Sequence, residues 1–89
     1  MKNRLIYIAK VVSTHGLKGE LKIYTYLDDP KSIINFKKLY DKNGNEIFII
    51  QNIKFQKNNL VIASILNFST KNQVDSFVGE KIYIDKLEL

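Results

Sequence analysis

Alternation of apolar and polar residues is the feature that most limits what this chain can fold into. In residues 20–27 one parity is aliphatic or β-branched: Leu21, Ile23, Thr25 and Leu27. The other parity is charged or aromatic: Glu20, Lys22, Tyr24 and Tyr26. A period of two is that of a β-strand, because successive side chains of a strand point to opposite faces. The segment therefore predicts a half-buried strand whose outer face carries tyrosine and lysine.

Four further segments predict strands. Residues 47–55 repeat the alternation with four aligned side chains: Ile47, Ile49, Ile53 and Phe55. Gln51 interrupts them, where a β-bulge would re-aim the strand. Residues 5–12 and 60–66 are apolar at both parities, which is typical of strands covered on both faces. A last strand at residues 81–84 would close the sheet and protect its edges.

Turn residues separate these segments. Gly16 and Gly19 bracket a loop between the first two strands, and both tolerate a positive φ. Asn43-Gly44, within the turn at residues 41–45, predicts a tight hairpin between Leu39-Tyr40 and Ile47. Asn58-Asn59 predicts a second hairpin, between Phe55 and Leu60. Short turns of this kind predict an antiparallel sheet.

Two short helices are predicted. Asp29-Pro30 offers a cap and a first-turn proline for a helix over residues 31–36. Residues 70–73 have the spacing of a capping box, with an apolar stripe after it and Gly79 as its end. The stripe consists of Val74, Phe77 and Val78. We expect an all-β barrel in which the second helix plugs one end.

Length and composition limit the class of protein. Eighty-nine residues predict a single domain spanning 1–89. No apolar run reaches the ~18 residues that a membrane span requires, and the basic start Met1–Arg4 has no signal-peptide pattern after it, which favours a cytoplasmic protein. The net charge of +5 favours a polyanionic partner. Since every basic residue except Arg4 is lysine, AT-rich coding bias explains that charge equally well.

The sequence contains no pattern typical of a catalytic site or a metal site. His15 is the only histidine, and neighbouring Ser13 and Thr14 do not form a nucleophile–base pair merely by adjacency. One histidine without cysteine is a poor zinc site. Asp28 and Asp29 precede Pro30 and are better explained as helix-start residues. We therefore expect no enzyme, no metal and no cofactor.

Nucleic-acid contact has two candidate sources. Gly16–Gly19 matches the G-x-x-G loop of KH domains, but that loop joins helices, whereas strands flank it here. Tyr24 and Tyr26 lie with Lys22 on one strand face and could stack on single-stranded bases. The same tyrosines could instead cover the barrel or pack against another domain.

Residues 8–23 are similar to the opening signature of the RimM family. The most specific part is Thr14-His15-Gly16-Leu17-Lys18-Gly19-Glu20. Weaker agreement covers nearly all of the remaining chain: Leu27–Pro30, Lys37–Tyr40, Thr70–Gly79 and Ile82–Ile84. The resemblance implies a closed six-stranded antiparallel barrel of the translation-factor kind, and it marks Thr14–Glu20 as a partner-binding surface.

The resemblance also implies a function without catalysis. RimM-family proteins assist late maturation of the small ribosomal subunit and processing of its rRNA, docking near the subunit head through a ribosomal protein. They carry a second, carboxy-terminal barrel of the PRC type, which this sequence does not contain. Where the family commonly has Asp-Arg at the second helix, this chain has Thr70-Lys71, so it cannot make an interaction that needs the fork of arginine. We therefore assign that helix a structural role.

Three hypotheses follow. In the first, the chain is part of an assembly factor that docks on the immature small subunit. In the second, it is a general RNA-binding barrel that binds single strands through Tyr24, Tyr26 and lysines. In the third, it is a structural module whose apolar face packs against a partner domain. No small-molecule substrate and no membrane partner are expected.

Overall fold

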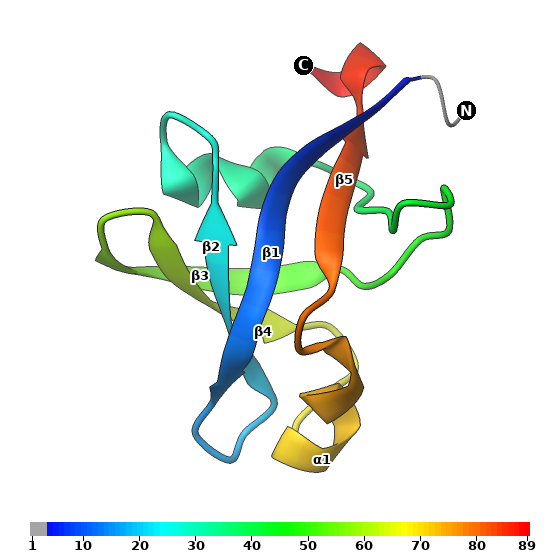
Figure 1. Cartoon of the computed structure of the whole chain (residues 1–89). Helices are drawn as coiled ribbons and strands as arrows, with labels where there is room; N and C mark the ends of the chain where they lie inside the picture. The colour runs from blue at the N-terminus through cyan, green and yellow to red at the C-terminus, as the bar shows by residue number, and fades with distance from the viewer. Residues whose placement is uncertain (1–3) are drawn as a thin grey trace.

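The computed structural model describes residues 4–89 and contains one antiparallel sheet of five strands in the order β3-β4-β2-β1-β5 (Figure 1). The strands are β1 (Leu5–His15), β2 (Glu20–Thr25), β3 (Ile50–Lys57), β4 (Leu60–Ile65) and β5 (Lys81–Asp85). All four strand pairings are antiparallel, as the turn residues predicted. Most of the basic start, Met1–Asn3, lies outside the described residues. Within residues 4–89 no helix has the length and apolarity needed to cross a membrane.

The helices are short and begin where the capping residues predicted. Asp29 accepts a hydrogen bond from the Lys31 amide (3.1 Å) and starts the 3₁₀ helix η2 (Pro30–Asn35). The α-helix α1 (Lys71–Val74) begins with the predicted capping box at Thr70 and continues as the 3₁₀ helix η3 (Asp75–Phe77). A last 3₁₀ turn, η4 (Lys86–Glu88), follows β5.

The core lies on the aliphatic side of β2. Leu21, Ile23 and Thr25 are fully buried, while Tyr24 and Tyr26 are exposed, so the predicted faces are confirmed. In β4 both parities are buried, as predicted. In β1 that prediction is wrong, because Lys10 and Val12 are exposed on its outer side.

The β3 segment follows a different parity from the one predicted. The register shifts between Ile50 and Asn52, which confirms a bulge at Gln51. On the N-terminal side of this bulge, Phe48 is buried and Ile49 is exposed. On its C-terminal side, Phe55 is 49% exposed. The four aligned apolar residues therefore do not form one buried row. The reason is position, since β3 is an edge strand and only part of its inner face is covered.

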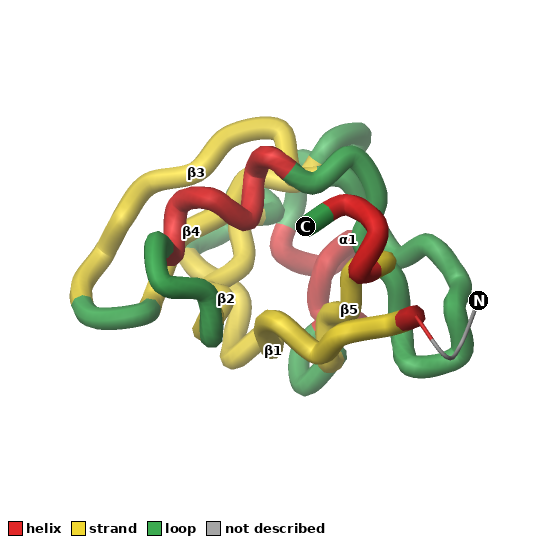
Figure 2. Tube along the Cα trace, turned by 90° about the horizontal axis from the view of Figure 1, so that it is seen from above, coloured by secondary structure: helices red, strands yellow, loops and turns green. Residues whose placement is uncertain are grey.

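The predicted closed barrel of six strands is not what the chain forms. The sheet has five strands and is unclosed, and Figure 2 shows it strongly curved, with β1 and β3 on opposite sides of the view. At the sixth position Tyr40 makes isolated bridges to Tyr83 of β5 and to Glu46. Within residues 4–89 the segment before the Asp41–Asn45 turn forms these two bridges and no longer strand.

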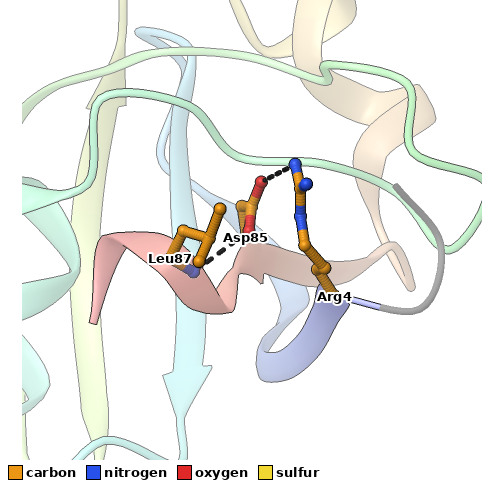
Figure 3. Close-up of polar contacts among 3 residues, drawn as sticks. All are labelled: Arg4, Asp85 and Leu87. Atoms are coloured by element: carbon orange, nitrogen blue, oxygen red, sulfur yellow. Dashed lines mark hydrogen bonds and ion pairs between the residues drawn. The ribbon is translucent and has the colours of Figure 1, made fainter.

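An ion pair joins the outer ends of β1 and β5 (Figure 3). Arg4 Nη2 lies 2.8 Å from Asp85 Oδ2, while Asp85 Oδ1 accepts the Leu87 amide proton at 3.0 Å and caps η4. The Leu87 amide, and after it the Arg4 guanidinium, hold the pKa of Asp85 below its usual value. This junction lies at the opposite end of the molecule from the β1–β2 loop and α1 (Figure 1).

Candidate functional site

The predicted surface Thr14–Glu20 is the tip of the β1–β2 hairpin. His15 pairs with Glu20 at the end of the ladder, so Thr14 and Glu20 belong to the strands. The four residues His15–Lys18 are exposed, and Leu17 is 78% exposed. Gly19 is buried. The run therefore divides into an exposed tip, His15–Lys18, and a buried attachment at Gly19.

The attachment is made to the start of α1. The Leu17 carbonyl accepts a hydrogen bond from the Lys71 amide at 3.0 Å. Gly19 has a φ of +81°, and a Cβ built on it would lie 2.9 Å from the Thr70 nitrogen and 3.0 Å from the Ser69 carbonyl carbon. Backbone therefore packs on backbone with no space for a side chain. The role of α1 includes holding the exposed tip in place.

Gly16 has a different environment. Its φ is +66°, yet a Cβ would meet nothing within 4 Å. Both glycines have the positive φ that the sequence predicted, but only Gly19 is also required by close packing.

The exposed tip offers side chains that suit recognition of a partner. His15 is exposed at the end of a strand, and Asp29 serves as the cap of η2, which confirms the helix-start interpretation of that carboxylate. Within residues 4–89 no three His, Cys, Asp or Glu side chains gather closely enough to hold a metal ion. Leu17 and Lys18 offer an apolar and a cationic contact, which suit docking.

A second candidate surface is a row of four tyrosines on the outer face of the sheet, which we call the tyrosine row. Its members are Tyr24, Tyr26, Tyr7 and Tyr83, in spatial order. Successive ring centroids are 5.2, 5.1 and 5.5 Å apart. The sequence pointed to Tyr24 and Tyr26 but missed Tyr7 and Tyr83. Tyr83 could have been found, since it alternates with the apolar Ile82 and Ile84 in a predicted strand.

Contact with its neighbours raises the pKa of one member of the tyrosine row, Tyr7. The hydroxyls of Tyr7 and Tyr26 are 3.4 Å apart. This hydrogen bond, then burial and the nearby Tyr26 and Tyr83 hydroxyls, raise the pKa of Tyr7 to about 12. The phenol of Tyr7 is therefore neutral throughout the physiological range.

Two lysines border the tyrosine row. Lys10 of β1 lies directly opposite Tyr24 of β2 and opposite Lys81 of β5. The Lys81 ammonium also lies 5.6 Å from the centre of the Tyr7 ring. Among residues 4–89, the ion pairs are Arg4–Asp85 and Lys71–Asp75, so neither Lys10 nor Lys81 is paired with an acid.

A third surface is an apolar cleft of about 350 Å³ beside the 39–49 segment. Its apolar lining includes Leu39, Ile47, Ile49, Leu66 and Phe68. Ile49 and Leu66 are exposed there, so the cleft is the counterpart of the apolar face that the third hypothesis expected.

Comparison with known proteins decides the family. The sequence profile of the RimM N-terminal domain matches residues 6–89. The chain belongs to the RimM family. A relative named ribosome maturation factor RimM, from Wolbachia sp. subsp. Drosophila simulans, is 30% identical over 89 residues, covering 100% of this chain and 52% of the relative. A Caulobacter relative of the same name is 31% identical over 85 residues. The match covers 96% of this chain and 44% of that relative.

Solved RimM structures share the fold. A crystal structure of a 16S ribosomal RNA processing protein RimM from Pseudomonas aeruginosa superposes with a TM-score of 0.80 at 23% identity, covering 96% of this chain and 52% of that one. The solution structure of the N-terminal domain of RimM from Thermus thermophilus superposes with a TM-score of 0.73 at 16% identity. The match covers 97% of this chain and 94% of that one. At these identities the likeness shows the fold alone. This RimM-family chain spans about half the length of the curated relatives that it matches.

Proposed function

We propose that this chain acts in ribosome maturation, as a non-catalytic, cytoplasmic assembly factor for the small ribosomal subunit. The observation that carries the proposal is the family membership, because its curated relatives are named ribosome maturation factors. The proposed role is assistance in late maturation of the subunit and in processing of its rRNA. The proposed partners are a small-subunit precursor, contacted near its head through a ribosomal protein and rRNA, and a carboxy-terminal PRC-type domain of the same protein. Residues 1–89 would form a single domain of it.

The docking surface in this proposal is the hairpin tip with its flanking strand residues, Thr14–Glu20. Leu17 is 78% exposed, and the neighbouring Lys18 is exposed and forms no ion pair with another residue of 4–89. A side chain with this exposure adds little to folding, so Leu17 is available for contact with a partner. The Gly19 attachment to Ser69–Thr70 keeps the tip in one position, which lowers the entropy lost on docking.

Co-sedimentation of the full-length protein with small-subunit precursors tests the proposal. We expect binding to the precursor and not to the mature large subunit. Changing Leu17 and Lys18 together to alanine should reduce binding at least about tenfold, since an apolar anchor and a charge contact are each worth about 1 kcal/mol or more. The matched control changes Leu87 and Lys42 to alanine, because Leu87 is 72% exposed and Lys42 lies in another exposed turn. Equal loss in both variants would remove the tip from the proposal, and no binding by the unchanged protein would end it.

A further inference from the structure

The tyrosine row and its two lysines form an outer face on which aromatic rings and cations meet. Tyr26 is 56% exposed and Tyr24 is 38% exposed, and Tyr7 and Tyr83 continue the row at partial burial. The rings contact one another edge-on or tilted, which leaves ring surface open to solvent at the Tyr24–Tyr26 end. Strand pairing fixes the positions of Tyr7 and Tyr83, which lie opposite each other in the β1–β5 ladder directly before its register shift.

The charges on this face are unfavourable for the protein alone. Lys10 and Lys81 lie directly opposite each other across β1 and β5. Like charges in that position destabilise a sheet. Lys22 of β2 adds a third cation on the same side of the sheet. The acidic residue on that face of β2 is Glu20, which lies at the hairpin end of the strand. A bound anion between Lys10 and Lys81 would relieve their repulsion.

We propose that the tyrosine row binds a single-stranded segment of RNA, with bases stacked on Tyr24 and Tyr26 and a phosphate held by Lys10 and Lys81. This inference deepens the proposed function and rests on it, since it names the RNA contact of the same assembly factor. The rings supply stacking surface for any base, and the lysines supply charge next to it, which is the combination that recognises single strands. Single strands fit the open rings better than paired RNA does, because the bases of a duplex are already stacked on one another.

Binding of a fluorescent oligouridine of about eight nucleotides to the full-length protein tests the inference by anisotropy. Stacking on one ring is worth about 1–3 kcal/mol, so Y24A/Y26A should weaken binding by about tenfold or more. Y24F/Y26F keeps both rings and should stay within about threefold of the unchanged protein. K10Q/K81Q should lower the slope of log K against log salt by about 0.7 for each phosphate that a lysine no longer neutralises.

Phe55 provides the matched control. It is 49% exposed, and its ladder partner Val61 is buried in the core, so Phe55 lies on the opposite face from the tyrosine row. F55A should leave RNA binding unchanged. Thermal unfolding of Y24A/Y26A should occur within about 4 °C of the unchanged protein, which separates lost binding from lost folding.

Four results would overturn the inference, three of them from the binding assay. They are unchanged affinity in Y24A/Y26A, equal loss in Y24F/Y26F, or tighter binding of duplex than of single strands. A fourth is protection of the tyrosines by a separately expressed carboxy-terminal half of the protein, with no effect of RNA, which would make the row a domain interface. Failure of the proposed function is distinguishable, because it appears as absence of co-sedimentation with small-subunit precursors whatever the oligouridine result.

Discussion

The two ends of β1 carry surfaces built in different ways. At the His15 end, the exposed tip is held by backbone contacts with α1: the Leu17–Lys71 hydrogen bond and the close approach of Gly19 to Thr70. At the Tyr7 end, the tyrosine row is held by strand pairing and by contacts among its own side chains. The first surface depends on two segments separated by about fifty residues of chain. The second depends on the register of β1 with both β2 and β5.

This difference predicts different tolerance to substitution. A backbone-to-backbone contact has no free volume, so even one added methyl group must displace an entire segment. A row of partly exposed side chains loses only the packing of the ring that is removed. Changes at the hairpin attachment should therefore alter the fold, and changes in the tyrosine row should alter binding and acidity while leaving the fold intact.

The largest effect is expected for Gly19→Ala. The added Cβ would lie 2.9 Å from the Thr70 nitrogen and the residue has a φ of +81°, so strain and overpacking together should cost about 3 kcal/mol of unfolding free energy. Gly16→Ala is the matched control, since its φ is also positive but its surroundings are open, and about 1 kcal/mol is expected. Urea denaturation of both variants measures the difference. Equal losses would mean that the contact with Thr70 does not restrict the loop.

A smaller loss is expected for Thr70→Ala. The Thr70 hydroxyl accepts the Gln73 amide at 3.4 Å, and the Gln73 side chain accepts the Thr70 amide at 3.1 Å, so the capping box supports the segment that holds the tip. Removing the cap should cost about 1 kcal/mol and should speed hydrogen exchange of the Lys71 amide. Asn72→Ala, in the same helix and exposed, should change neither. An unchanged exchange rate of the Lys71 amide in Thr70→Ala would show that α1 holds the hairpin tip in place even when the Thr70 cap is missing.

A pH-dependent effect is expected at the Arg4–Asp85 junction. The folded-state pKa of Asp85 is below 3.8, so its contribution to stability is present above that pH and is lost as the pH falls through the folded-state value. Asp85→Asn should therefore be less stable than the unchanged protein at pH 7, and the difference should shrink below pH 3.8. Because the Leu87 amide lowers this pKa as well as Arg4, Arg4→Gln should retain part of the pH dependence. Denaturant midpoints across this pH range measure both variants, and a difference that does not change with pH would contradict the assignment.

The smallest effect is spectroscopic. Tyr26→Phe removes the hydrogen bond that contributes most to the raised pKa of Tyr7, so that pKa should fall from about 12 toward 10.0. Because the folded-state pKa is the higher one, stability should decline as pH rises between these values, and the variant should decline less. Ultraviolet titration of tyrosinate measures the shift. Tyr24→Phe is the control, since Tyr24 contacts Tyr26 and not the Tyr7 hydroxyl; an equal fall there would show that the hydrogen bond is not the cause.

Local features of the fold were predictable from the chain. The faces of β2, the bulge at Gln51, the cap at Asp29 and the capping box at Thr70 all follow from short-range patterns, and the structure confirms each. The closed sixth strand was wrong because Tyr40 has only isolated bridges, and the buried row of residues 47–55 was wrong because β3 lies at the edge. In both cases the deciding quantity was coverage by distant segments, which alternation does not encode.

The candidate surfaces divide in the same way. The motif Thr14–Glu20 could be recognised in the chain, and its exposed tip lies where a hairpin between two strands must place it. The attachment of Gly19 to Ser69–Thr70, and the meeting of Tyr7 and Tyr83 with Tyr24 and Tyr26, could not be derived, because each joins strands or helices far apart in sequence.

Short-range patterns were enough to place the five strand segments approximately, the starts of the helices and the apolar face of β2. These properties depend on side-chain alternation and local hydrogen bonding, both of which act over a few residues. Three further features became visible in the folded chain alone: α1 holds the hairpin tip, four tyrosines form one row, and Lys10 lies opposite Lys81. Strand order and register bring these groups together, and both are fixed by burial of the whole core.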